Sequence, residues 1–317
     1  MRVFVAGASG AIGRRLLPQL VAAGHEVTAI TRSEKKLEPI ASMEARAVVC
    51  DVFDAARLRQ AVADSGAEAV IHQLTDLPQR VRPRRLKRYY AANDRVRQEG
   101  TANLLDAARR AGVRRIVAQS AAFWYAPGDH QIKTEADPLY LEAPAPIGSA
   151  VRTMKSVEDA VTGAEEIEGI ALRYGFLYGP GTWYTREGDI GRQVRQWRYP
   201  IIGKGKQVYS FIHLDDAAAA TVAALERAAP GIYNVVDDEP ARAREWMPAF
   251  AKALAAPRPL RVPAFVARLA AGNAPLVWMA SLRGASNAKI KRELGWVPRY
   301  PSWRQGFLEG LGRETAR

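Results

Sequence analysis

The chain has 317 residues, 48% of them hydrophobic and 25% charged, which supplies enough apolar material for a sizeable core and excludes a disordered or fibrous protein. Its 46 Lys and Arg against 33 Asp and Glu give a formal net charge of +13, so we expect it to meet anionic ligands or surfaces. The single cysteine, Cys50, excludes an internal disulfide, and because no Cys/His spacing resembles a zinc site we expect no metal.

The N-terminus alternates as a strand over 2–6, and no apolar segment with a small-residue cleavage site precedes it. We therefore expect no signal peptide and a cytoplasmic location. The segment 262–282 is long and apolar, but Arg268, Asn273 and two prolines interrupt it. We expect a pair of helices in a soluble lobe there, and no membrane partner.

Short runs rich in Val, Ile and Ala alternate with helical stretches along the first half of the chain. The runs lie at 2–6, 26–30, 47–50, 68–73, 114–119 and 169–173, with helices such as 11–23 and 98–111 between them. Strands that alternate with helices predict an α/β fold with a parallel sheet covered on both faces. The sequence therefore predicts a doubly wound Rossmann domain.

Beyond about Gly179 this regularity weakens, and Gly and Pro cluster. We expect a nicotinamide dinucleotide-binding domain over 1–180 and a smaller, mostly helical substrate-binding lobe over 181–317. A helix from Asp215 to Ala228 and a strand over 231–236 are predicted to return to the sheet, so that about 211–236 completes the first domain.

A glycine-rich loop follows the first strand directly and precedes a helix. The spacing Gly-x-x-Gly-x-x-Gly permits a tight turn, close approach of a pyrophosphate, and a helix N-terminus that faces the phosphates. The expected cofactor contacts in this loop are Gly7, Ser9, Gly10, Ala11, Ile12 and Gly13.

The tip of the second strand reads Ile30-Thr31-Arg32-Ser33, with Lys35 and Lys36 close behind. An acidic side chain at this place holds the ribose 2′-hydroxyl of NAD, whereas a cation suits the 2′-phosphate of NADP. Thr31 and Arg32 therefore predict a preference for NADP(H), with NAD(H) possible.

With this loop and the motifs that follow it, the sequence resembles the extended or atypical branch of the short-chain dehydrogenase/reductase superfamily, which is epimerase/dehydratase-like. Further support comes from segments in the same order along the chain: VIHQLT at 70–75, EGTANLLDAA at 99–108, LRYGFLYGPG at 172–181, FIHLDDAAAA at 211–220, YNVVDDEP at 233–240 and KRELGWVPRYP at 291–301. The resemblance implies cofactor contacts from Asp51, Val52, Leu74, Thr75, Lys155, Tyr174, Gly175 and Phe176.

Relatives in this superfamily carry Ser or Thr, and then Tyr-x-x-x-Lys, as a proton relay. Matching the helix by Lys155 and Glu158 puts Val151 where the tyrosine belongs, and matching it by 146–149 puts Ile147 there. The hydroxyl position falls either on Ser120 or on Ala121, according to whether Trp124 or Tyr125 is the family's aromatic residue. The resemblance thus implies Lys155, Ser120 and Tyr125 as catalytic candidates and an altered tyrosine position.

Three accounts of function compete. The first is an NAD(P)-dependent oxidoreductase that transfers hydride between NADP(H) and a carbonyl or conjugated small molecule. The second is an NADP-binding sensor or scaffold protein without turnover, and the third is a nucleotide-sugar epimerase or dehydratase. The missing tyrosine is the residue that would usually decide among them.

The remaining polar residues have simpler interpretations. His25, His72 and His213 are expected to be structural, and Asp215 and Asp216 are expected to cap a helix.

The basic stretch 80–88, followed by Arg95 and Arg97, is expected to clamp an anionic substrate or to be a solvated surface. No motif that reads nucleic acid accompanies it, so we expect no nucleic-acid partner. The loop 181–210 is predicted to give a cationic, aromatic wall for an anionic or aromatic small-molecule substrate, with Trp183, Tyr184, Trp197 and Tyr199 as its flat surface. The resemblance implies a homodimer through the helices around 94–111 and 151–163.

Overall fold

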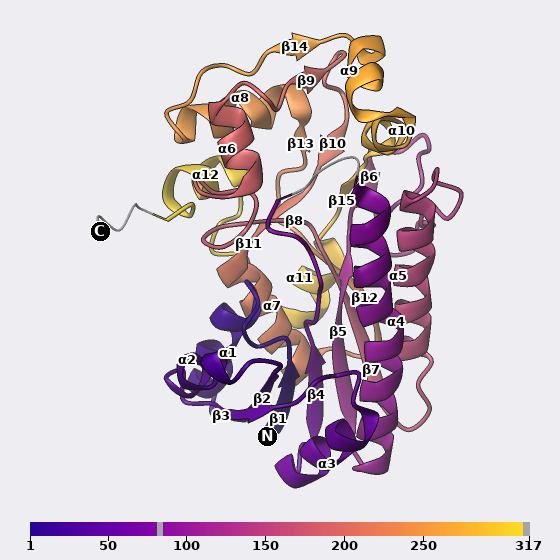
Figure 1. Ribbon diagram of the computed structural model, residues 1–317, viewed down its shortest axis with the longest axis vertical. Coiled ribbons are helices and arrows are strands. Elements are labelled where there is room, and N and C mark those ends of the chain that lie inside the picture. The colour runs from indigo at the N-terminus through magenta and orange to yellow at the C-terminus, as the bar shows by residue number, and fades with distance from the viewer. Residues whose placement is uncertain (81–84, 313–317) are drawn as a thin grey trace.

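The structure is a computed structural model that describes residues 1–80 and 85–312. Residues 81–84 of the basic stretch lie outside the described residues. Figure 1 shows two layers of helices around a central sheet in the lower part of the molecule, with a smaller lobe above them.

The central sheet has seven parallel strands in the order β12-β7-β5-β4-β1-β2-β3. Their bounds are β1 (Arg2–Ala6), β2 (Glu26–Thr31), β3 (Arg46–Val49), β4 (Ala69–His72), β5 (Arg115–Ala121), β7 (Glu168–Tyr174) and β12 (Gly231–Val235). The predicted Rossmann fold is confirmed. The direction of winding reverses between β1 and β4, and ligands of such sheets bind outside the carboxyl ends of the strands at this switch point.

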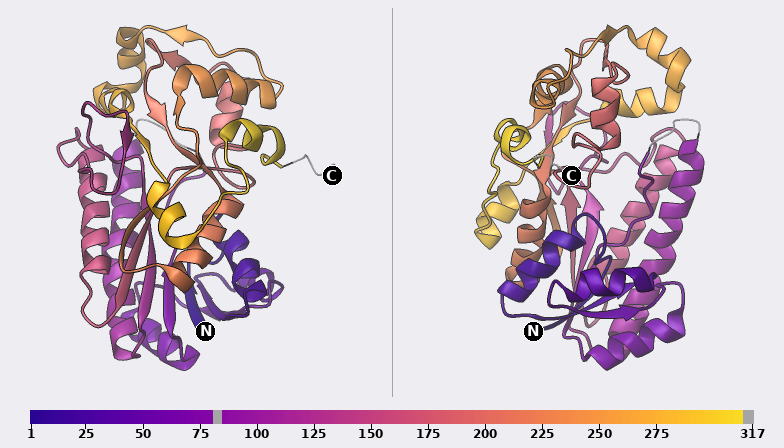
Figure 2. Two further views of the ribbon diagram at one scale, coloured as in Figure 1. Left: turned by 180° about the vertical axis from the view of Figure 1, so that it is seen from behind. Right: turned by 60° about the vertical axis from the view of Figure 1, so that its left-hand side comes forward.

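Helices cover both faces of the sheet (Figure 2). One face packs against α1 (Gly13–Ala22), α7 (Leu214–Arg227) and α11 (Ala288–Leu294), and the other against α3 (Ala55–Ser65), α4 (Leu86–Arg110) and α5 (Ile147–Thr162). In β1, Val3 and Val5 belong to the first core while Phe4 and Ala6 belong to the second. Burial on both sides explains why the strands read as continuous apolar runs in the sequence.

The upper lobe is built from short elements. Its helices are α6 (Asp189–Arg195), α8 (Ala243–Ala253), α9 (Ala264–Ala271), α10 (Asn273–Ser281) and α12 (Trp303–Glu309). Its paired strands are β6 (Ile132–Lys133) with β15 (Gly284–Ala285), β8 (Phe176–Tyr178) with β11 (Phe211–His213), β9 (Ile201–Ile202) with β14 (Arg261–Val262), and β10 (Val208–Tyr209) with β13 (Ala241–Arg242). η1 (Glu34–Lys36) and α2 (Leu37–Ala41) link β2 to β3.

The chain leaves the sheet for the lobe after β7 and then returns. The predicted returning helix and strand are confirmed as α7 and β12, and β12 pairs with β7 from Gly231 to Val235. The apolar segment 262–282 forms α9 and α10, and no helix within the described part of the chain is long and apolar enough to cross a membrane. The domain limits at 180 and 181 stay a prediction.

Candidate functional site

The glycine-rich loop connects β1 to α1 in a shape that side chains would obstruct. Gly7 has a φ of +100°, and a Cβ atom there would lie 2.6 Å from the backbone of Gln73. A Cβ atom on Gly13 would lie 2.3 Å from the carbonyl oxygen of Ala8. The first turn of α1 has no side-chain cap. The N–H groups of Arg14 and Arg15 donate to the carbonyl oxygens of Gly10 and Ile12, whereas that of Gly13 has no backbone acceptor among the described residues and is available to an anion. These residues fit the pyrophosphate of a dinucleotide.

The tip of β2 presents positive charge beside this loop. Thr31 is buried, and its Oγ1 accepts a hydrogen bond from the backbone N–H of Ser33 at 3.2 Å. Arg32 is exposed and makes no ion pair with any residue of 1–80 or 85–312. Lys36 Nζ donates to Ser9 Oγ at 3.2 Å, which connects this tip to the glycine loop.

The end of β3 carries Asp51 and Val52, which the resemblance implies as cofactor contacts. Asp51 Oδ1 accepts a hydrogen bond from the backbone N–H of Phe53 at 3.0 Å, and Val52 is buried. The carboxylate is therefore held in one orientation by its own turn.

Buried polar groups fix the end of β4. The His72 ring is completely buried, with Nε2 3.0 Å from Thr101 Oγ1, and its Nδ1 accepts from the backbone N–H of Leu74 at 3.3 Å. Burial, together with the nearby Arg97, lowers the pKa of His72 to about 3, so the ring is neutral. His72 therefore has the structural role expected for it, because its ring holds the backbone of Leu74 in place. Thr75, the next residue, is exposed.

The end of β7 carries three residues that the resemblance implies as cofactor contacts. Tyr174 is buried, and its hydroxyl binds Gln73 Nε2 at 3.0 Å and Thr221 Oγ1 at 2.7 Å. The hydroxyl therefore links β4 to α7, and a contact of Tyr174 with the cofactor stays a prediction. Gly175 is also confined, since a Cβ there would lie 2.5 Å from the carbonyl oxygen of Ser210. Phe176 is half-buried.

Arg97 is a buried cation that the sequence led us to place in a surface stretch, and that expectation was wrong. It is 4% exposed, and Nη1 donates to the carbonyl oxygen of Gln119 at 2.7 Å, at the end of β5. Desolvation lowers the pKa of Arg97 to about 10 despite the favourable charge of Asp94. Its Nε is buried without a hydrogen-bond partner among the described residues. Arg97 lies four residues before Thr101 and seven before Leu104, on the buried side of α4. This helical spacing is the signal in the sequence that could have predicted its burial.

Ser120 and Tyr125, two of the expected catalytic residues, belong to a buried hydrogen-bond network. Ser120 Oγ donates to Glu158 Oε1 at 2.5 Å, and Glu158 is paired with Arg173 at 2.6 Å. Arg173 Nη1 donates to Tyr125 Oη at 2.9 Å, and that hydroxyl donates to Asn234 Oδ1 at 2.7 Å. Desolvation raises the pKa of Tyr125 to about 12. Both hydroxyls are thus engaged within the core, which argues for a structural role.

Lys155 lies on the outer side of α5. Its side chain is 44% exposed, and Nζ is 2.6 Å from Asp159. Around this turn α5 buries Ala150, Val151, Thr153, Met154, Val157 and Glu158. Met154, one position earlier, is 5% exposed, so α5 buries Met154 and leaves the Lys155 ammonium at its outer side. That Lys155 holds the nicotinamide ribose stays a prediction.

The surface between the ends of β5 and α5 is consequently apolar. Ala121 is 8% exposed, Ala150 3% and Met154 5%. Tyr90 of α4 packs against the cluster that contains Ala121 and Met154, and its hydroxyl makes no hydrogen bond with a described residue. Burial, with a smaller contribution from Asp94, raises the pKa of Tyr90 to about 12. Sequence reasoning did not identify Tyr90, because its partners come from α5 and the loop after β5.

The predicted aromatic wall over 181–210 is divided between two places. Tyr184 is buried and Tyr199 packs beside it on Trp246 in the core of the lobe, so neither is a free surface. Trp197 is 55% exposed. Trp183 is half-buried, and its Nε1 donates to the carbonyl oxygen of Pro78 at 2.9 Å, which ties the loop after β4 to the lobe.

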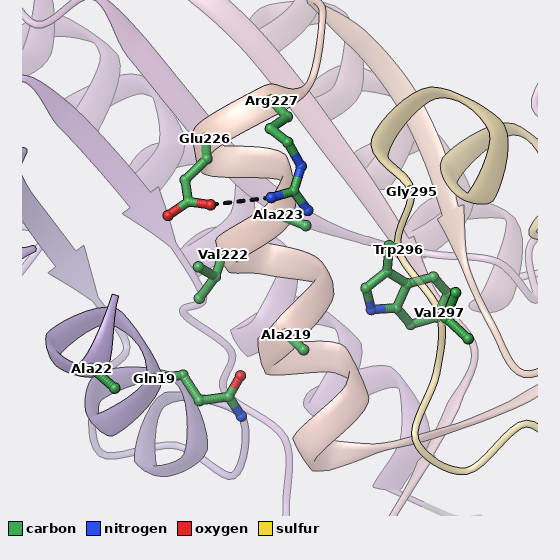
Figure 3. Close-up of a pocket in the computed structure, with 10 residues that line it drawn as sticks. All are labelled: Gln19, Ala22, Ala219, Val222, Ala223, Glu226, Arg227, Gly295, Trp296 and Val297. Carbon is green, nitrogen blue, oxygen red and sulfur yellow. Dashed lines mark hydrogen bonds and ion pairs between the residues drawn. The ribbon is translucent and has the colours of Figure 1, made fainter. Parts of the chain in front are cut away.

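A surface hollow of about 450 Å³ lies away from this edge of the sheet, at the other end of α1 (Figure 3). It is lined by Gln19, Ala22, Ala219, Val222, Ala223, Glu226, Arg227, Gly295, Trp296 and Val297. Arg227 Nη1 pairs with Glu226 at 3.3 Å across its rim. None of the predicted cofactor residues lines it.

Comparison with known proteins adds independent information. The model of the NAD dependent epimerase/dehydratase family matches residues 3–235. The "3-diazoavenalumate denitrifying reductase" of a Streptomyces species is 43% identical over 320 residues, covering 99% of this chain and 100% of that protein. A "2-alkyl-3-oxoalkanoate reductase" from Stenotrophomonas maltophilia is 27% identical over 81% of this chain and 77% of its own length.

The fold resembles that of two solved sugar-nucleotide enzymes. UDP-glucose 4-epimerase from Thermotoga maritima superposes with a TM-score of 0.76 at 17% identity, covering 98% of this chain and 97% of the other. dTDP-glucose 4,6-dehydratase from Streptomyces venezuelae, solved with NAD bound, superposes with a TM-score of 0.75 at 24% identity, covering 98% and 96%. These two similarities concern the fold alone.

Proposed function

Because the chain belongs to the NAD dependent epimerase/dehydratase family and is a nicotinamide-dependent oxidoreductase, we propose that it uses NADPH to replace the diazo group of an aromatic substrate by hydrogen. The observation that carries this proposal is the apolar surface of Ala121, Ala150 and Met154 where a proton relay was expected. The Streptomyces relative, a denitrifying reductase that resembles this chain over its whole length, supports the reaction class.

The chemistry explains why an apolar surface suits this reaction. Reduction of a ketone adds a hydride to carbon and a proton to oxygen, so it benefits from a positioned acid. Replacement of an aryl diazonium group by hydrogen consumes one hydride only, since a C–H bond takes the place of the C–N bond and dinitrogen leaves. When bound, the nicotinamide supplies this hydride. A site for this reaction needs orientation and shelter from water, and it needs no acid.

The residues of the chain divide these tasks. The loop from Gly7 to Gly13 and the N-terminus of α1 bind the pyrophosphate, and Arg32 binds the 2′-phosphate. Ala121, Ala150 and Met154 keep water away from the reacting carbon.

A second candidate, reduction of a carbonyl compound, is favoured by one observation. Tyr90 is half-buried beside the same surface, and its hydroxyl has no partner among residues 1–80 and 85–312. In this reaction Tyr90 would give the proton to the carbonyl oxygen. The Stenotrophomonas relative, which is named a reductase of an oxoalkanoate, is in keeping with it.

Turnover with isotopically labelled cofactor tests the proposal. The protein is mixed with NADPH deuterated on the nicotinamide ring and with para-carboxybenzenediazonium, and an enzyme-free mixture corrects for the uncatalysed reaction. We expect dinitrogen release and deuterium on the ring carbon that carried nitrogen. NADPH binding without either product would refute the proposal. If the protein instead oxidises NADPH with ketones, and Tyr90→Phe abolishes that oxidation, the second candidate is favoured.

The preference for NADP(H), the cytoplasmic location and the homodimer belong to this proposal as well. The exposed, unpaired Arg32 supports the first, and the net charge of +13 supports an acidic group on the substrate. The homodimer would form through α4 and α5, over 94–111 and 151–163. Light scattering of the purified protein tests the dimer, and titration with the four nicotinamide cofactors tests the preference.

A further inference from the structure

A set of aromatic rings lies where the carboxyl ends of β5 and β7 meet the upper lobe. Phe123, which follows β5, stacks on Phe176, which follows β7, with ring centroids 4.6 Å apart and planes inclined by 20°. Trp124 lies 4.9 Å from Phe123, and Trp278 of α10 lies 5.4 Å from Trp124. We call Phe123, Trp124, Phe176 and Trp278 the aromatic platform.

The aromatic platform joins the two parts of the molecule. Phe123 and Trp278 each pack both against the core of the lobe and against the side chains around the start of α5. The second group includes Ala121 and Met154, which belong to the surface proposed for the reaction. The platform therefore borders the place where the substrate must lie.

Its rings are only partly covered by the protein. Phe123, Phe176 and Trp278 are all half-buried, whereas Trp124 behind them is 7% exposed. Flat rings with accessible area favour stacked or edge-on contact with another aromatic ring.

The indole of Trp278 adds an unsatisfied donor. Its Nε1 is buried and has no acceptor among the residues that the structure describes. Trp246, Trp296 and Trp303 have the same deficit, but each of them is at most 4% exposed and lies within a core. Trp278 alone of these four remains half-buried, so a ligand on the platform can supply the missing acceptor.

We infer that the aromatic platform binds the ring of the substrate, and that Trp278 Nε1 donates a hydrogen bond to an oxygen atom carried by that ring. The inferred substrate class is a planar aromatic compound with an oxygen substituent. This inference rests on the proposed function for the position of the substrate, but it concerns recognition and not the reaction.

Binding of an unreactive ligand tests the inference apart from turnover. The probe is para-hydroxycinnamate, titrated calorimetrically into the protein saturated with NADP, with the saturated analogue 3-cyclohexylpropanoate as the comparison. Phe123→Leu removes a stacking ring and Trp278→Phe removes the indole donor. Each is expected to weaken binding of para-hydroxycinnamate about 3- to 10-fold, the range for one aromatic contact or one hydrogen bond.

Two matched variants serve as controls. Phe265→Leu makes the same change at a ring that is 69% exposed on α9, and Trp296→Phe removes another unpaired indole beside α7. Both should bind the probe as the parent protein does. NADP affinity, measured on every variant, verifies that the fold is intact.

The outcomes separate recognition from reaction. Equal binding of the planar and saturated probes, or unchanged binding in both platform variants, overturns the inference. Weakened binding in those variants supports it even if no diazo compound is reduced, in which case only the proposed function fails. Reduction of a diazo compound that neither variant affects overturns the platform and leaves the reaction standing.

Discussion

The ion pair between Glu158 and Arg173 offers the sharpest test of the network that holds Ser120. Glu158 is completely buried, and its oxygens accept from Arg173 Nε at 2.7 Å, from Arg173 Nη2 at 2.6 Å and from Ser120 Oγ at 2.5 Å. In Glu158→Gln one oxygen becomes an NH₂ group that faces donors, and the guanidinium loses its counter-charge. Removal of one partner of a buried pair costs about 3–5 kcal/mol, so the free energy of unfolding should fall by that amount.

Urea unfolding followed by tryptophan fluorescence measures this loss. The matched control is Asp159→Asn, which removes the partner of Lys155 on the same helix but at a side chain that is 60% exposed. It should cost no more than about 0.5 kcal/mol, as exposed helical pairs do. Glu158→Gln combined with Arg173→Met should be more stable than Glu158→Gln alone, because the unpaired buried charge is gone. A loss below about 1 kcal/mol in Glu158→Gln would refute the reasoning.

Other consequences follow from the same structure. Lys155→Ala should leave turnover nearly unchanged, because the ammonium is paired with Asp159 at the surface; steady-state kinetics that show a large fall in kcat would restore Lys155 to the site. Arg32→Ser should weaken NADPH binding about 10- to 100-fold, since a hydrogen bond to a charged group contributes about 1.5–3 kcal/mol, while calorimetry with NADH should show little change. His72, with its pKa lowered to about 3, binds a proton more readily in the unfolded chain. Stability should therefore fall as the pH drops below about 6.5, by about 2 kcal/mol at pH 5, and urea titrations of His72→Asn should lack this part of the dependence.

The parts of the site that the sequence could predict are those determined locally. The loop from Gly7 to Gly13 sits between a strand and a helix, and its shape depends on glycines that neighbour one another in the chain. The strands and the return of β12 were likewise legible, since burial on both faces leaves continuous apolar runs.

The orientation of α5 was beyond such reasoning for a geometric reason. Successive residues of an α-helix point about 100° apart. An alignment that is shifted by one position therefore exchanges the buried Met154 for Lys155, whose side chain is 44% exposed. The short match around Lys155 and Glu158 did not fix that position. The hydrogen bonds of Ser120 and Tyr125 could not be predicted, because their partners, Glu158, Arg173 and Asn234, lie far away in the sequence.

The path of the chain between sheet and lobe has a consequence for motion. It leaves the sheet for β6 after β5 and returns at α5, crosses outward after β7 and returns with α7, and leaves after β12 before it comes back at α11 and ends in the lobe with α12 (Figure 1). Large hinge movements need a few residues that absorb the rotation, and several separate crossings would all have to bend together. The lobe should thus hold its orientation to the sheet with or without cofactor, and substrate should enter through local movement of side chains and loops.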